Sequence, residues 1–191
     1  MDKGIQIIVT YRRTSRLSMR VSKQGEIHIS APYGLAKEEV ERFYLSNQAW
    51  IAKALSQQNA HNERRQQFYN QLSLKTKKEK EEAIARLKAC TDPLIEKYAN
   101  AMGVHPYTIE YKPTISRWGA CQKQTKRIQF SLYLLLLPAW CIEHVVVHEL
   151  AHLKEANHSP KFYAIMDQFF PKWKEARLET KRIIEEYTPN T

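Results

Sequence analysis

The protein has 191 residues, 43% of them hydrophobic, and carries a net charge of +10. This length suits one domain of good size, or one domain with a smaller appendage. No apolar run approaches the ~20 residues that a membrane-spanning helix needs, which argues against a membrane protein. The excess of 30 Lys and Arg over 20 Asp and Glu favours an anionic partner such as nucleic acid, nucleotide or acidic protein, although many basic proteins bind none of these.

Cysteine usage and the N-terminal residues bear on the compartment. Cys90, Cys121 and Cys141 are scattered and form no CxxC pair, a pattern typical of reduced thiols that serve as small core residues. The opening stretch MDKGIQIIVTYRR lacks the basic-then-apolar order of a secretory signal. We therefore expect a cytoplasmic protein.

The chain begins with a β-rich segment. Residues 5–11, 16–21 and 26–32 show the apolar runs or alternation of short strands, and Gly25 supplies permissive backbone for a hairpin between the last two. Residues 36–58 then place apolar side chains at helical spacing, which predicts a helix.

A polar stretch, 59–73, follows this helix and reads either as a linker or as a solvated helical extension. We place a domain boundary near Leu72, which gives an N-terminal β-hairpin and helix segment at 1–72 and a second domain at 73–191.

The second domain opens with a helix that has a clear start and stop. Thr76 and Glu79 have the spacing of a capping box. Apolar side chains then recur at helical intervals as far as Met102, and Gly103 is a natural C-terminal stop. Pro93 is expected to kink or interrupt this helix.

The remainder predicts two strands and then three helices. Strands are expected at 107–113 and 127–134. The stretch between them, 114–126, reads as a strand or a loop with a tight place at Gly119, and the run LYLLLLPAW reads as a buried strand end and turn. The helices are expected at about 138–156, 160–170 and 171–187. Helices and strands segregated in this order indicate an α+β domain.

The first of these three helices carries a metal-ligand pattern, HEXXH. His148 and His152 are four residues apart, so they share one face of a helix that is otherwise strongly apolar. Two imidazoles at that spacing can bind one Zn²⁺. Glu149 projects beside such an ion, where it can act as a general base on an activated water.

A catalytic zinc needs a third protein ligand, and His158 is the strongest candidate. Asn157 can adopt the left-handed conformation that ends a helix, Ser159 can cap the next helix, and Pro160 suits its first position. His144, one turn before His148, is open as an alternative ligand, a supporting group or a wall of the cleft, and we favour a role other than ligand. Glutamate ligands, Glu175 or Glu179, rank well below His158.

The stretch SRWGACQKQTKRIQFSLYLLLLPAWCIEHVVVHELAHLKEANHSPKFYAIM resembles the YgjP-like metallopeptidase domain family, a group of small zincins. The matching blocks are 117–121, 134–138, 146–153 and 157–162, with Ala120 where the family usually has Ser. The early stretch YRRTSRLSMRVSKQGEIHISAP also resembles the family's N-terminal β segment.

This resemblance implies that His148, His152 and His158 bind zinc and that Glu149 is catalytic. The implied fold is a minimal zincin-like domain, in which a twisted sheet presents an edge strand above the active-site helix. We expect that edge strand at 127–131, where an extended peptide can add by backbone hydrogen bonds. A more distant resemblance to SprT-like proteases, which act on proteins crosslinked to DNA, is compatible with the basic charge.

The function expected is therefore that of a zinc-dependent metallopeptidase acting on a peptide or protein. Arg117 and Tyr163 are candidates for substrate binding and for stabilising the oxyanion. One alternative is a metal-dependent nucleotide pyrophosphatase, although the sequence has no Gly-rich phosphate loop. Another is a non-catalytic protein associated with nucleic acid through the basic runs YRRTSR, KTKKEK and KPTISRWGACQKQTKR.

Overall fold

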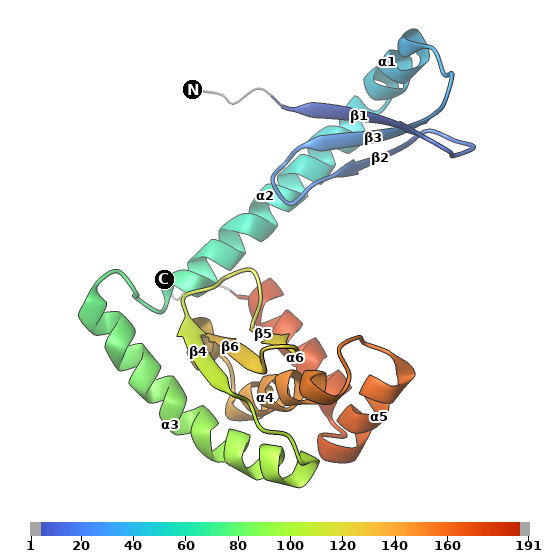
Figure 1. Ribbon diagram of the computed structural model, residues 1–191. Coiled ribbons are helices and arrows are strands. Elements are labelled where there is room, and N and C mark those ends of the chain that lie inside the picture. Colours follow the sequence, from blue (N-terminus) through green and yellow to red (C-terminus); the bar gives the residue numbers. More distant parts are fainter. Residues whose placement is uncertain (1–4, 188–191) are drawn as a thin grey trace. The chain divides into compact units, whose positions relative to one another are not determined.

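The computed structural model describes residues 5–187 and divides the chain into two compact units, Met1–Gln66 and Gln67–Thr191. Helices and strands are mixed, with α-helices and two small sheets among the described residues (Figure 1). The domain boundary expected near Leu72 stays a prediction, because compactness does not test whether either segment folds alone.

The first unit contains a three-stranded sheet in the order β1-β3-β2. The strands are β1 (Ile7–Arg12), β2 (Ser18–Val21) and β3 (Ile27–Pro32). β2 and β3 form the expected antiparallel hairpin, with Gly25 at φ 83°, whereas β1 pairs with β3 in parallel. Alternate residues of β3 are buried with Val40 and Ile51 in a small core.

The helix predicted at 36–58 is interrupted and then extended. It consists of α1 (Lys37–Ser46) and α2 (Gln48–Asn70). The break lies at Asn47, whose side-chain amide donates to the carbonyl of Phe43 at 2.7 Å and so competes with the helical hydrogen bonds. The polar stretch after residue 58 is helical almost to its end, which favours the helical extension over the linker.

The second unit begins with α3 (Lys77–Met102), whose ends are those expected. The capping box is present, since the side chains of Thr76 and Glu79 each bond the other's backbone N–H, and Gly103 is left-handed at φ 65°. Pro93 was expected to kink or interrupt this helix; an interruption is wrong, because α3 is continuous through that residue, and the kink stays a prediction. Proline has no backbone N–H, so α3 lacks one helical hydrogen bond at Pro93. The packing of the buried face of α3 in the core stabilises the helix despite this loss.

The second sheet has the order β4-β6-β5. Its strands are β4 (Thr108–Lys112), β5 (Gly119–Gln122) and β6 (Arg127–Ser131). β6 pairs in parallel with β4 and antiparallel with β5. The prediction that 127–131 is an edge strand is therefore wrong, because β6 is the central strand and β5 is an edge strand. The physical reason is that Ile128 and Phe130 of β6 are apolar and fully buried in the core.

The apolar run after β6 forms a 3-10 helix, η1 (Leu132–Leu136), and not the expected strand end. The hydroxyl of Ser131 caps it by accepting from the backbone N–H of Tyr133 at 3.3 Å. Three helices follow: α4 (Ala139–Lys154), α5 (Pro160–Phe169) and α6 (Trp173–Glu185).

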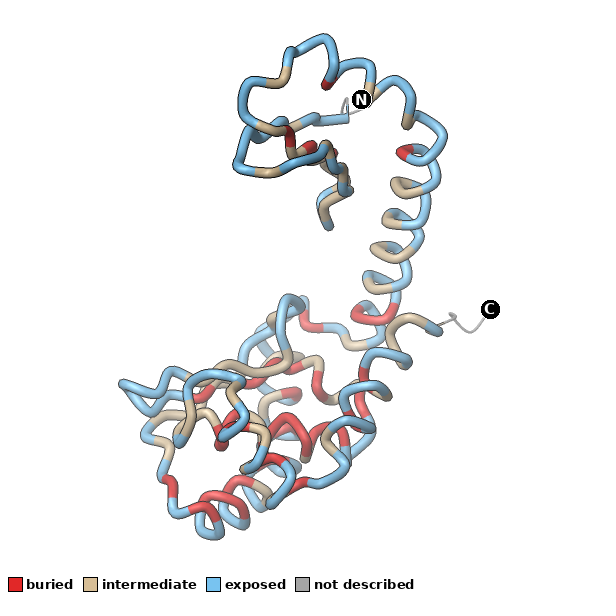
Figure 2. The backbone as a smooth tube through the Cα atoms, turned by 90° about the vertical axis from the view of Figure 1, so that its right-hand side faces the viewer, coloured by how far each residue is buried: buried red, intermediate tan, exposed pale blue. Residues whose placement is uncertain are grey.

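Helix α4 is the centre of the second unit. It contacts α3, β5, α5 and α6, so it is surrounded by other elements, and Figure 2 shows the buried residues concentrated in this unit. This position explains why α4 is apolar on most of its circumference and tolerates three consecutive valines.

Two further expectations concern the thiols and the membrane. Cys141 is buried and Cys121 half-buried, but Cys90 is exposed, so the prediction that all three are core residues is wrong for Cys90. Among the described residues, no helix combines the length and the apolar character that crossing a membrane requires.

Candidate metal centre

Three imidazoles converge where α4 ends. His148 and His152 lie one turn apart on α4, and His158 follows in the connection to α5. The Nε2 atom of His148 is 3.2 Å from Nε2 of His152 and 3.1 Å from Nε2 of His158. Within residues 5–187, these three histidines form the one group of metal-ligand side chains close enough to hold an ion, with all three ligand atoms within 4.8 Å of one another.

The connection after α4 brings His158 back to the helix. Ser159 caps α5 by accepting from the N–H of Phe162, and Pro160 occupies the first turn, as expected. The left-handed conformation expected at Asn157 is wrong, because Lys126 is the one non-glycine residue with positive φ among those described. The chain turns instead through extended backbone after Lys154.

One ring nitrogen of His152 is held by the backbone. Its Nδ1 lies 3.1 Å from the carbonyl oxygen of Glu155. Since a carbonyl only accepts, Nδ1 carries the proton and Nε2 keeps its lone pair for the other histidines or a metal. Backbone geometry thus sets the tautomer that metal binding needs.

Phe162 forms a wall behind all three imidazoles. Its fully buried ring stacks on His152 with centroids 4.5 Å apart, and it meets His148 and His158 edge-on at 4.9 and 4.8 Å. Sequence reasoning assigned this residue no role, although its position in the first turn of α5, four residues after His158, was a usable signal. Phe162 fixes the ring orientations by packing.

Glu149 is buried beside the imidazoles, with 5% of its surface exposed. Burial raises the pKa of its carboxyl to about 8, and the positive charge of Arg117 opposes that rise. A carboxyl whose pKa is near neutrality can both take up and release a proton in this range.

Gly119, the first residue of β5, lies directly against the Glu149 carboxyl. A Cβ at Gly119 would lie 2.6 Å from Cγ and 2.7 Å from Cδ of Glu149, and would overlap Oε1 as well. The φ angle of Gly119 is not in the left-handed region, so the glycine is needed for space and not for conformation. The sequence indicated a tight place here but not what fills it.

The other candidate residues lie around this centre. Tyr163 lines a cavity of about 320 Å³ together with His148 and His158. Arg117 is exposed and lines a different cavity, of about 370 Å³, beside β5. The structure therefore brings Tyr163 to the histidines and Arg117 to the neighbourhood of Glu149.

His144 is close to the histidine group but not part of it. Its ring centroid is 5.9 Å from that of His148, and it lines the same cavity as Tyr163. Burial, with the charge of Arg177 adding to it, lowers the pKa of His144 to about 4, so the imidazole is neutral. Its Nδ1 is buried and has no hydrogen-bond partner among the described residues.

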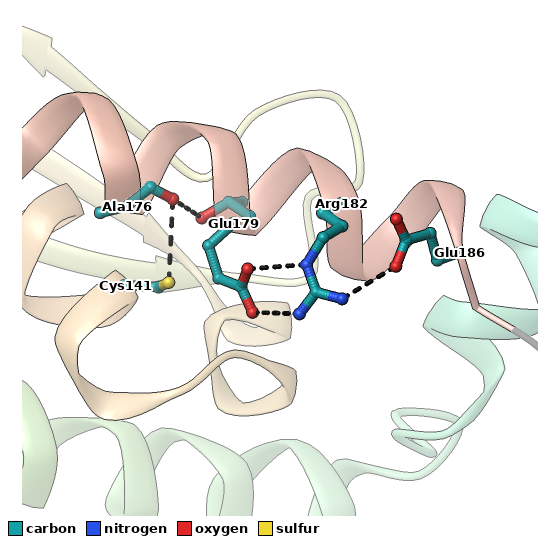
Figure 3. Close-up of polar contacts among 6 residues, drawn as sticks. Cys141, Ala176, Glu179, Arg182 and Glu186 are labelled. Atoms are coloured by element: carbon teal, nitrogen blue, oxygen red, sulfur yellow. Dashed lines mark hydrogen bonds and ion pairs between the residues drawn. The ribbon is translucent and has the colours of Figure 1, made fainter.

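The glutamates ranked below His158 lie outside the group. Glu179 forms a two-point ion pair with Arg182 at 2.7 and 2.8 Å, and Figure 3 shows its carboxylate directed along α6 toward that guanidinium. Glu175 is exposed. The described metal-ligand group contains neither of them.

The family of the chain follows from its sequence match. Residues 15–80 and 69–183 match the YgjP-like, metallopeptidase domain family. The chain belongs to this family. Membership in the YgjP-like family supports a metallohydrolase that acts on peptides, and it gives no support to nucleic-acid binding. A search of curated proteins gave no significant match.

Two solved metallopeptidase zymogens are similar to part of the chain: abylysin of Pyrococcus abyssi and jannalysin of Methanocaldococcus jannaschii. Their sequence identities are 24% and 20%, and both have a TM-score of 0.43. Each alignment covers 48% of this chain and 93% of the other. These values describe a partial likeness and establish nothing about the chemistry of this YgjP-like protein.

Proposed function

We propose that the protein is a zinc-dependent metallopeptidase whose metal is held by His148, His152 and His158. The convergence of the three Nε2 atoms carries this proposal. Zn–N bonds of ~2.0–2.1 Å at tetrahedral angles put ligand nitrogens roughly 3.3 Å apart. The 3.1 and 3.2 Å separations at His148 are close to that value, and three imidazole nitrogens are a donor set that suits zinc.

In the proposed mechanism, Glu149 is the general base. A bound zinc ion would polarise a substrate carbonyl and a water molecule. Glu149 then takes the proton of that water and later delivers it to the leaving amine. Burial of the carboxyl against Gly119 holds it in one position and keeps bulk water away from the proton.

An extended peptide is proposed to dock along β5, at the edge of the second sheet. β5 pairs on one side only, with β6, and contacts α4. Its first residue, Gly119, lies against Glu149, so backbone hydrogen bonds to β5 would bring a substrate carbonyl to the histidines. The proposed arrangement would be zincin-like, with β5 in the place expected for 127–131.

Arg117 and Tyr163 are proposed as substrate-binding residues, the first near Glu149 and the second beside His158. The charge of Arg117 is close enough to act on Glu149, and the ring of Tyr163 stacks with that of His158 at 6.3 Å. A guanidinium or a phenol at these places can stabilise a developing oxyanion.

Removal of the metal tests the proposal. Purified protein is expected to contain about one zinc per chain and to cleave an unstructured protein such as casein. Dialysis against a chelator should remove both the zinc and the cleavage, and added zinc should restore cleavage, whereas added magnesium should not, because imidazole is a poor magnesium ligand. Cleavage that persists at full rate in zinc-free protein would contradict the mechanism.

Gly119→Ala tests the position of Glu149 without changing any ligand. The added methyl overlaps the carboxyl group, which must move by a fraction of an ångström or more. We expect kcat/KM for peptide cleavage to fall by about 100-fold, while the zinc content stays unchanged because residue 119 is not one of the proposed ligands. Unchanged cleavage by a folded, zinc-loaded Gly119→Ala protein would show that the position of Glu149 is not critical.

A further inference from the structure

A cavity beside the candidate metal centre combines one cation with aromatic walls. Its volume is about 320 Å³, and the residues that line it include His148, His158, Tyr163, Trp173 and Arg177. A group held there is next to two of the three converging imidazoles. This volume is in the range of small-ligand sites.

Packing of α6 on α4 anchors the backbone of α6 at Arg177, a residue that lines this cavity. Ala176, the preceding residue, is fully buried, and its carbonyl accepts from the Cys141 thiol of α4 at 3.8 Å (Figure 3). The backbone at position 177 is therefore anchored, although the Arg177 side chain itself is exposed.

The guanidinium of Arg177 lines the cavity and has no carboxylate partner in the part of the chain that the structure describes. Glu179, two positions further along α6, pairs with Arg182, and none of the residues that line the cavity is acidic. The cavity is thus positively charged and lacks an internal counter-ion.

The aromatic walls are rigid. Tyr163 and Trp173 stack with centroids 4.9 Å apart and an interplanar angle of 22°. The indole N–H of Trp173 donates to Asp167 at 2.7 Å, which fixes the ring and occupies that carboxylate. Walls that do not move lose little entropy when a ligand binds.

We propose that this cavity selects substrates by binding a carboxylate on a residue that flanks the scissile bond, with Arg177 as the specificity-determining residue. The inference rests on the proposed peptidase function. The carboxylate comes from one of two sources, an acidic side chain or the free C-terminus of the peptide. A guanidinium binds either through two parallel hydrogen bonds.

The test uses quenched fluorescent peptides of one sequence, with Glu, Gln or Lys placed in turn on each side of the cleaved bond. Wild-type protein is expected to cleave the Glu peptide with a kcat/KM about 10-fold above that of the isosteric Gln peptide. Arg177→Gln should remove the preference, and Arg177→Glu should shift it toward Lys. Peptides cut next to a free or an amidated C-terminus separate the two sources of carboxylate.

A matched control is Lys181→Gln, which removes one positive charge one turn further along α6, outside the cavity. It should keep the preference for Glu, because only a local contact and not the net charge selects the substrate. A Lys181→Gln variant that loses the preference as Arg177→Gln does would overturn the proposal.

Binding separates this inference from the peptidase proposal. Zinc-loaded Glu149→Gln protein is titrated with fluorescein-labelled versions of the same peptides, and binding is followed by anisotropy. Tighter binding of Glu peptides that depends on Arg177 supports the cavity assignment even if wild-type protein cleaves nothing, a result that would reject the peptidase alone. Cleavage without any preference for a carboxylate would reject the cavity assignment alone.

Discussion

Glu149→Gln is expected to lower kcat/KM for peptide cleavage by about 1,000-fold or more while zinc stays bound. Glutamine has nearly the same shape as glutamate but cannot take a proton from water, so the variant loses general-base catalysis, which contributes about 10²–10⁴-fold. The measurement is steady-state cleavage of one peptide by both proteins, with zinc content determined by elemental analysis.

The buried position of Glu149 makes this substitution a clean one. The side chain has 5% of its surface exposed and a carboxyl whose pKa burial raises, so a neutral amide fits the environment and the folded state should not be destabilised. Thermal unfolding of the two metal-free proteins checks this point. If the folded, zinc-loaded variant cleaves at the wild-type rate, Glu149 is not the base.

His158→Ala is expected to weaken zinc binding by more than about 100-fold, since loss of a group that only supports a ligand already costs about 10–100-fold. His158 is exposed, so its truncation leaves no cavity in the core and the protein should remain folded. Elemental analysis after gel filtration, and competition for zinc with a chromophoric chelator, measure the effect.

His144→Ala is the control for that experiment, because it removes an imidazole from the neighbouring turn of α4. His144 lies outside the group of three, so this variant should keep its zinc. If His144→Ala loses zinc and His158→Ala retains it, the assignment of the third ligand is wrong.

Much of the candidate centre could be predicted from short-range sequence rules. Because His148 and His152 are four residues apart, the helical repeat places them on one face of α4. Ser159 and Pro160 indicate the start of α5, so His158 is expected in a short connection between the two helices. The ends of α3 were equally predictable, because Thr76, Glu79 and Gly103 act through bonds within a few residues of themselves. In each case the interacting groups are close along the chain.

Only the tertiary structure decided which strand lies beside Glu149. The sequence of β6 reads as a strand, but its central position results from pairing with both β4 and β5, and strand order depends on contacts that local periodicity does not encode. The role of Gly119 depends on the contact of β5 with α4, which brings Gly119 against Glu149, 30 residues later in the sequence.

The sequence by itself determined the candidate metal ligands, the spacing of two of them on α4 and the start of the helix that follows, because these depend on backbone geometry over one or two turns. The continuity of α3 through Pro93, the wall formed by Phe162 and the cavity under Arg177 depend on how α3, α5 and α6 pack around α4. Packing brings residues that are distant in the sequence into contact. The free energy gained by burying their apolar surface outweighs the secondary-structure preferences of short segments of the chain.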